Sequence, residues 1–119
     1  MKVLLVEDHA GLAELSSRLL HDVYDHDVEH ASTGHKALEM LGNFRPELVL
    51  LDINLPDMDG YELARKIRAQ HDDDNMVLVA LTGFGNVIDD AAAGAAGFDA
   101  HFRKPMDFEV LPQLKRSRN

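Results

Sequence analysis

The sequence predicts an α/β fold built on a five-stranded parallel sheet, and three observations lead to this prediction. Short apolar runs typical of strands alternate along the 119 residues with segments whose apolar residues fall at helical spacing. Two of the runs, 48–51 and 76–81, are continuously apolar, as is typical of strands buried on both faces of a parallel sheet. No repeat or low-complexity segment interrupts the alternation, so we expect a single domain over residues 1–119.

The first half of the chain predicts three strands and two helices. Residues 2–6 form an apolar strand, and residues 10–21 form an amphipathic helix with leucines on one face. Residues 26–31 are a more polar strand that suits the edge of a sheet. A second helix is predicted from residue 34 to about residue 43, and the third strand, 48–51, is uninterrupted by polar residues.

The second half predicts two strands and three helices. The strands are residues 76–81 and 100–103. The third helix follows Asp59, a credible N-cap; the fourth covers about 87–96; and the last begins at Asp107.

Two residues weaken the last two predicted helices. Gly94 interrupts a run of alanines, so we expect the fourth helix to be the least firmly packed, with Gly97 as its C′ residue. Pro112 falls inside the last helix, where proline removes a backbone donor and crowds the preceding turn.

Five strands alternating with five helices favour a flavodoxin-like, doubly wound sheet with strand order 2-1-3-4-5. In this order the first and third strands are neighbours, and all strands end at the same edge. Polar residues follow these ends, and we expect them to converge: Glu7, Asp8, Asp52, Thr82 and Lys104.

Composition excludes several classes of protein. The sequence has no cysteine, which rules out disulfides, thiolate zinc sites and a cysteine nucleophile. A formal net charge of −9 argues against a nucleic-acid surface. No apolar run reaches membrane-spanning length and no signal peptide is apparent, so we expect a cytoplasmic protein without membrane insertion.

The predicted cluster suits phosphoryl chemistry. Three carboxylates in one crevice repel each other unless a cation lies among them, and a site of oxygen ligands with room for water suits Mg²⁺. The Thr82 hydroxyl and the Lys104 ammonium would complement the oxygens of a phosphoryl group, and Asp52 would serve as its nucleophile. Each residue alone also has a purely structural explanation, such as capping a helix; the combination favours a site.

Four motifs give the chain a resemblance to a known family. They are V-E-D at 6–8, L-L-D-I-N-L-P-D-M-D-G at 50–60, L-T-G at 81–83 and K-P at 104–105. With these motifs the chain resembles the receiver (response-regulator) domain of bacterial two-component signalling over essentially its whole length.

The resemblance implies that Asp52 is the phosphoacceptor, which receives its phosphoryl group from a histidine kinase or a phosphotransfer protein. It implies that Asp8, Asp52 and the backbone carbonyl of Asn54 hold Mg²⁺, with Mn²⁺ as an alternative ion and Glu7 contributing through water. Such a receiver catalyses only its own phosphorylation and dephosphorylation, and is not a turnover enzyme.

The resemblance also implies that Thr82 and Lys104 bind the phosphoryl group and that the Lys104–Pro105 bond is cis. Switching in the family couples the threonine to an aromatic residue three positions before the lysine, which is His101 here. Histidine can titrate near neutral pH, so we hypothesise a pH-sensitive output. Phe84 stands at a position that in the family affects the lifetime of the phosphoryl group.

Two alternatives come from other classes. A haloacid-dehalogenase-type phosphatase also uses an aspartyl phosphate, but it needs a second Asp where this chain has Asn54, and usually a cap insertion. A receiver-like docking module that no longer takes phosphate would normally lack the Asp, the Thr or the Lys, and none is missing.

The output partner is left open by the sequence. It is an output protein or a fused kinase: the stretch G-F-D-A-H-F-R-K-P resembles receivers of hybrid sensor kinases, whereas Met1 directly before the first strand favours a free-standing regulator. Gly94 and Pro112 lie in the region that many receivers use to dimerise, so we expect a monomer or a weak dimer.

Overall fold

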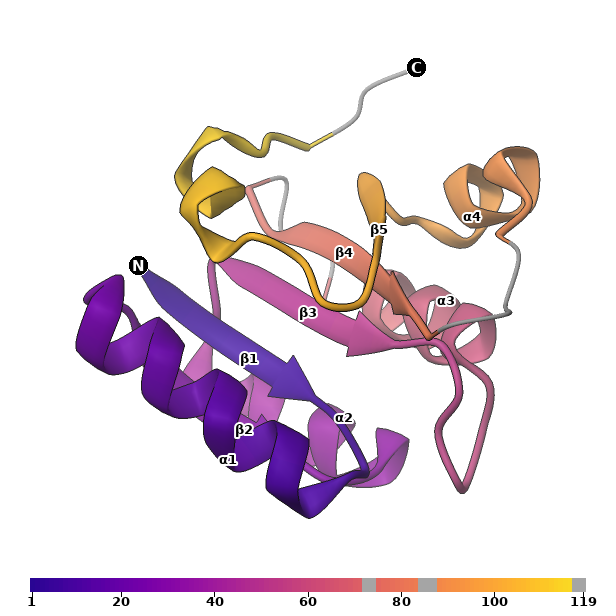
Figure 1. The fold of residues 1–119 in the computed structure, drawn as a ribbon. Helices are drawn as coiled ribbons and strands as arrows, with labels where there is room; N and C mark the ends of the chain where they lie inside the picture. The colour runs from indigo at the N-terminus through magenta and orange to yellow at the C-terminus, as the bar shows by residue number, and fades with distance from the viewer. Residues whose placement is uncertain (72–74, 84–87, 117–119) are drawn as a thin grey trace.

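A computed structural model describes residues 1–71, 75–83 and 88–116 (Figure 1). The predicted start of the fourth helix at residue 87, and Phe84, lie outside these residues. The elements follow in the order β1 (Lys2–Val6), α1 (Ala10–Arg18), the π-helical turn η1 (Leu19–Val23), β2 (Asp27–Ala31), α2 (Gly34–Phe44), β3 (Leu48–Asp52), α3 (Gly60–Gln70), β4 (Val77–Thr82), α4 (Asp90–Ala96), β5 (Ala100–Arg103) and the 3₁₀-helix η2 (Phe108–Gln113).

The sheet confirms the predicted topology. Its five strands are parallel and run in the order β2-β1-β3-β4-β5. β1 and β3 are neighbours, with Val6 opposite Leu51. The carboxyl ends of all five strands therefore meet at one edge.

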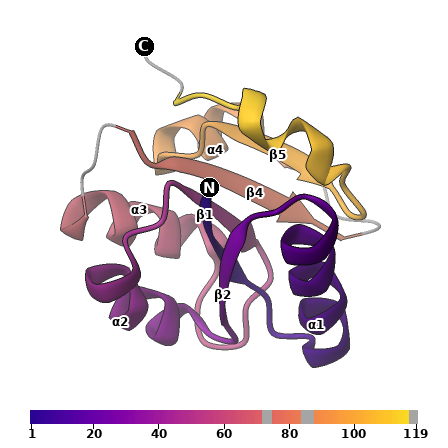
Figure 2. The same cartoon turned by 90° about the vertical axis from the view of Figure 1, so that its left-hand side faces the viewer.

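Helices cover both faces of this sheet, and Figure 2 shows α1 on the side opposite α2 and α3. All five residues of β3 are buried. Val49 and Leu51 pack in one core cluster with side chains of α2, α3 and α4. Leu48 and Leu50 pack in a second cluster with α1 and η2. This two-sided burial is why β3 is apolar without alternation.

α4 begins later than predicted. Its first residue is Asp90, because the side chain of Asp89 caps the helix by accepting hydrogen bonds from the amides of Ala91 and Ala92. The helix has seven residues and ends at Gly97, which has a φ of 109°. The alanine-rich sequence has no bulky periodic residues that could indicate this boundary.

The last helix is a 3₁₀-helix rather than an α-helix. Pro112 lies inside it and cannot donate the backbone hydrogen bond that an α-helix needs. The buried side chains of Phe108 and Leu111 hold this short helix on the sheet.

The first helix continues through η1 to Val23, two residues beyond the predicted end.

A buried ion pair ties α3 to the region around α4. One guanidinium nitrogen of Arg68 lies 2.7 Å from Asp99 Oδ2, and their side chains are only 12% and 3% exposed. Arg68 also donates to the carbonyls of Met76 and Gly97, and Asp99 accepts from the Leu78 amide. The pair therefore links α3, β4 and the segment before β5.

We expect Arg68→Ala to lower the free energy of unfolding by about 3 kcal/mol, because it leaves a buried carboxylate without its cation. Urea denaturation followed by circular dichroism measures the change. Arg65→Ala, on the exposed side of the same helix, is the matched control and is expected to cost under about 0.5 kcal/mol. Equal losses in the two variants would contradict a special role for the buried pair.

Candidate functional site

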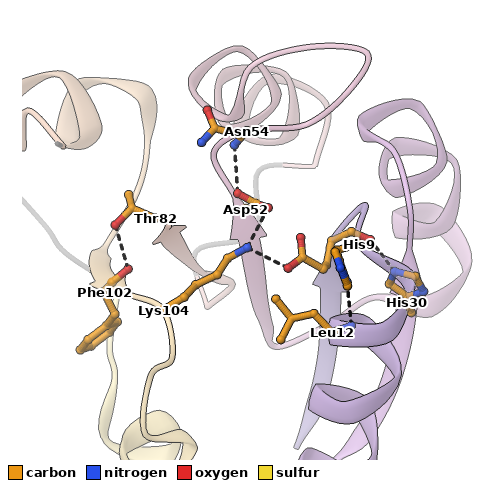
Figure 3. A network of polar contacts seen from close by, with 9 residues as sticks. His9, Leu12, His30, Asp52, Asn54, Thr82, Phe102 and Lys104 are labelled. Carbon is orange, nitrogen blue, oxygen red and sulfur yellow. Dashed lines mark hydrogen bonds and ion pairs between the residues drawn. The ribbon is translucent and has the colours of Figure 1, made fainter. Parts of the chain in front are cut away.

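Five polar residues predicted from the sequence lie together at the carboxyl edge of the sheet, and Figure 3 labels three of them, Asp52, Thr82 and Lys104. Asp52 and Thr82 are the last residues of β3 and β4. Glu7 and Asp8 follow β1 directly, and Lys104 follows β5. The order of the parallel strands thus brings residues up to 97 positions apart within contact distance.

The Lys104 ammonium group lies between two carboxylates. Its Nζ donates to Glu7 Oε1 and to Asp52 Oδ2, each at 2.8 Å. The carboxylate side chains are 5% and 8% exposed, and the lysine side chain is 21% exposed. The Lys104 amide donates to the Thr82 carbonyl at 2.7 Å, and the Lys104–Pro105 bond is cis, the form that the family resemblance implies.

Burial and the contacts among these charged groups move the pKa values of Glu7 and Asp52 in opposite directions. Burial, reinforced by the neighbouring Asp52, raises the pKa of Glu7 to about 7. Burial acts in the same direction on Asp52, but the adjacent Glu7 carboxyl, Lys104 and the Asn54 amide outweigh it, so the pKa of Asp52 is lowered. Burial would lower the pKa of Lys104, yet its two carboxylate partners raise it. Asp52 is therefore the carboxylate that stays ionised.

The acidic residues also form a set of donors for a hard cation. Carboxylate oxygens of Glu7, Asp8 and Asp52 lie within 4.8 Å of one another. Glu7 Oε2 is buried and has no hydrogen-bond partner among the described residues. An unpartnered buried oxygen next to two further carboxylates fits Mg²⁺ or Mn²⁺, which take oxygen ligands.

Asn54 lies beside this set. Its backbone amide donates to Asp52 Oδ1 at 3.0 Å, which fixes one side of the carboxylate while Lys104 holds the other. The Asn54 side chain is exposed, so only its peptide group is committed to the site.

Thr82 and His101 face different surroundings. Thr82 is 6% exposed, and its hydroxyl donates to the Phe102 carbonyl at 3.5 Å (Figure 3). His101 contacts Asp90, at the start of α4, through its Nε2. The structure thus brings Thr82 to the edge of the site and places the His101 ring beside α4.

Sequence reasoning missed three supporting residues. His30 Nε2 lies 2.7 Å from the Glu7 carbonyl, and the His9 side chain caps α1 by accepting from the Leu12 amide (Figure 3). Asp57 accepts hydrogen bonds from the start of α2. The Pro-Asp pair in the sequence indicates a turn, but nothing local reveals a partner 23 residues away.

Comparisons with known proteins agree on one family. A family model described as "Response regulator receiver domain" matches residues 3–115. The response regulator MprA of Mycobacterium leprae is 34% identical over 93% of this chain, which spans 47% of that protein, so the chain has about half the length of this relative.

Solved structures give the same result. The chemotaxis response regulator CheY4 of Vibrio cholerae is similar with a TM-score of 0.80 and 28% identity, covering 94% of this chain and 92% of that one. The response regulator TrrA of Thermotoga maritima, solved in complex with Mg²⁺ and BeF, has a TM-score of 0.78 and 27% identity, covering 94% and 93%.

We expect Glu7→Gln to stabilise the metal-free protein at pH 8 but not at pH 5. The pKa of Glu7 is raised from 4.5 to about 7, so wild-type stability falls as pH rises through this range and the buried group must ionise. Melting temperatures in a chelator should differ by roughly 3–6 °C at pH 8 and converge at pH 5. Glu39→Gln, on the exposed side of α2, is the control; a pH-independent gain for Glu7→Gln would contradict the assignment.

Proposed function

The chain belongs to the response regulator receiver domain family, and from this premise we propose that Asp52 takes the phosphoryl group from a histidine kinase or a phosphotransfer protein. Members of this family are phosphoacceptor receivers of two-component signalling. The observation that carries the residue assignment is the Lys104 ammonium lying between Asp52 and Glu7. It provides an ionised nucleophile and a cation at the same point of the sheet edge.

The residues have distinct roles in the transfer. An Asp52 carboxylate oxygen forms the new bond to phosphorus as the bond from phosphorus to the donor's nitrogen breaks, and the donor nitrogen keeps that electron pair. Lys104 balances the negative charge on the phosphoryl oxygens, and the Thr82 hydroxyl donates a hydrogen bond to one of them. In self-dephosphorylation at the same site, a water oxygen forms a bond to phosphorus as the bond from phosphorus to the Asp52 oxygen breaks, which releases inorganic phosphate and regenerates the Asp52 carboxylate.

Mg²⁺, with Mn²⁺ as the alternative, is the proposed cofactor. Asp8, Asp52 and the Asn54 backbone carbonyl would hold it, with Glu7 contributing through water. The ion supplies charge neutralisation for the phosphoryl oxygens. The cluster of carboxylates and the Mg²⁺ complex of the similar TrrA support this proposal.

We propose that the phosphoryl donor docks against α1. The exposed large apolar side chains of the described residues are Leu15, Leu19 and Val23, which lie along α1 and η1. A hollow of about 320 Å³ between α1 and η2 reaches Glu7 and Lys104. An apolar surface that leads to Lys104, which contacts the Asp52 nucleophile, fits the helix of a kinase or phosphotransfer partner.

Thr82 and His101 are the proposed switch. His101 pairs with Asp90 beside a hollow of about 220 Å³ that Asp99 also lines, and Asp99 is itself paired with Arg68. Moving the ring away from α4 would break the pair with Asp90 and free the start of this helix. The output side of the signal is thus proposed to be the α4–β5 face, read by an output protein or a fused kinase.

Membrane insertion, location, oligomeric state and nucleic-acid binding are the remaining expectations from the sequence. Within the described ranges no helix has the length and apolarity needed to cross a membrane. A cytoplasmic location and a monomer or weak dimer stay predictions, as does the absence of direct nucleic-acid binding.

Incubation with acetyl phosphate and Mg²⁺ is expected to add one phosphate to the protein, detected by intact mass. The adduct should disappear in Asp52→Asn and without Mg²⁺, because the nucleophile or the neutralising ion is lost. Asp59→Asn, at the N-cap of α3, is the control and should keep the adduct. A metal-bound wild type without an adduct would contradict the proposal and favour a docking module.

His101→Phe is expected to remove the pH dependence of the phosphorylation-induced change, because phenylalanine cannot be protonated. Amide chemical shifts of α4 before and after phosphorylation measure this change at each pH. Unaltered pH dependence in the variant would assign it to another group.

A further inference from the structure

The connection between β3 and α3, residues 53–59, carries Asn54 and is closed at its base. The Gly60 amide donates to the Ile53 carbonyl at 2.7 Å, and Asn54 and Asp59 form an isolated antiparallel bridge. A Cβ on Gly60 would lie 2.6 Å from the Ile53 Cα, so this close approach requires glycine. Figure 1 shows the rest of the connection extending beyond the sheet edge.

Hydrogen bonds to Asp57 attach the second half of this connection to the start of α2. Its Oδ1 accepts from the Gly34 amide at 2.9 Å, and its Oδ2 accepts from the His35 amide at 3.0 Å and contacts His35 Nδ1. These amides belong to the first turn of α2, where donors lack partners within the helix and the helix dipole favours an anion.

The charge state of Asp57 agrees with this arrangement. Burial is the largest single influence and would raise the pKa of Asp57, but the amides of Gly34 and His35 and the His35 ring together outweigh it, and the pKa falls to about 2. The side chain is 22% exposed. Asp57 is therefore ionised at neutral pH.

Packing reinforces the hydrogen bonds. Met58 is 8% exposed and lies against Gly34, where a Cβ would come within 2.8 Å of the Met58 Cγ. α2 already has its own N-cap, because Thr33 Oγ1 accepts from the Lys36 amide at 3.1 Å. Asp57 thus adds a second, long-range attachment to a helix that is already capped locally.

We propose that Asp57 is a positioning residue for the phosphoacceptor site, because by holding the 53–59 connection on α2 it fixes the peptide group of Asn54. That peptide donates its N–H to Asp52 Oδ1 and, under the proposed function on which this part rests, offers its carbonyl to Mg²⁺. Asp57 acts through Asn54 and touches neither the nucleophile nor the ion.

The first test uses the metal-free protein and two variants that each remove one attachment at the start of α2. Asp57→Ala should lower the ¹⁵N order parameter of the Asn54 amide from about 0.85 to about 0.6, the range of a flexible segment. Thr33→Ala removes the local cap of the same helix and should leave that order parameter unchanged. Asp57→Asn keeps one acceptor oxygen, so it should give an intermediate value and covers the case in which Asp57→Ala does not fold.

The second test measures Mg²⁺ affinity by titration of the full chain. Asp57→Ala should weaken Mg²⁺ binding about tenfold, at the lower limit for residues that orient metal ligands, while Thr33→Ala leaves the Kd unchanged. If the contact of Asp57 with α2 strengthens Mg²⁺ binding, then Mg²⁺ binding must strengthen that contact by the same free energy. Mg²⁺ should therefore slow hydrogen exchange of the Gly34 and His35 amides in the wild type.

Three results would overturn the proposal: an Asn54 amide that stays rigid in Asp57→Ala, equal loosening in Thr33→Ala, or an unchanged Mg²⁺ Kd in a variant with a mobile Asn54. A wild type that binds no Mg²⁺ would instead overturn the metal assignment of the proposed function. The order parameters of the metal-free variants still decide the role of Asp57 in that case.

Discussion

The site depends on one interaction, the Lys104 ammonium held between the carboxylates of Glu7 and Asp52. Two buried carboxyl groups this close repel each other, and without a cation one of them must be neutral. β5 is not adjacent to β3 in the sheet, so the lysine side chain must extend past the end of β4 to reach them. The contact of Lys104 with the two carboxyl groups therefore requires both this strand order and a side chain as long as that of lysine.

The protein contains a second buried ion pair, and the contrast between the two indicates their roles. Arg68 and Asp99 are surrounded by further hydrogen bonds from backbone groups, so the pair joins elements of the fold. At the sheet edge, Glu7 Oε2 has no partner among the described residues, the carboxyl groups of Glu7 and Asp52 share the Lys104 ammonium, and Asp8 adds a third carboxylate nearby. A charged cluster whose groups are incompletely paired within the protein is suited to receive an ion and an anionic group.

Much of the fold could be predicted because it follows from local patterns. Continuous apolar runs identify β3 and β4 as two-sided strands, and helical spacing identifies α1, α2 and α3. Since parallel strands end at a common edge, the polar residues after each run had to converge. The errors fall where the local pattern is weak: an alanine-rich helix without periodic bulk, and a C-terminal helix in which Pro112 prevents α-helical hydrogen bonding.

The sequence by itself thus determined the architecture and the set of residues at the sheet edge, because hydrophobic periodicity and strand ends are local properties. Only the tertiary structure decided that Asp52 rather than Glu7 stays ionised, that His101 pairs with Asp90, and that α2 anchors the loop of Asn54. These features depend on burial and on contacts between residues 11 to 97 positions apart. Such contacts exist only once the sheet has brought distant segments together.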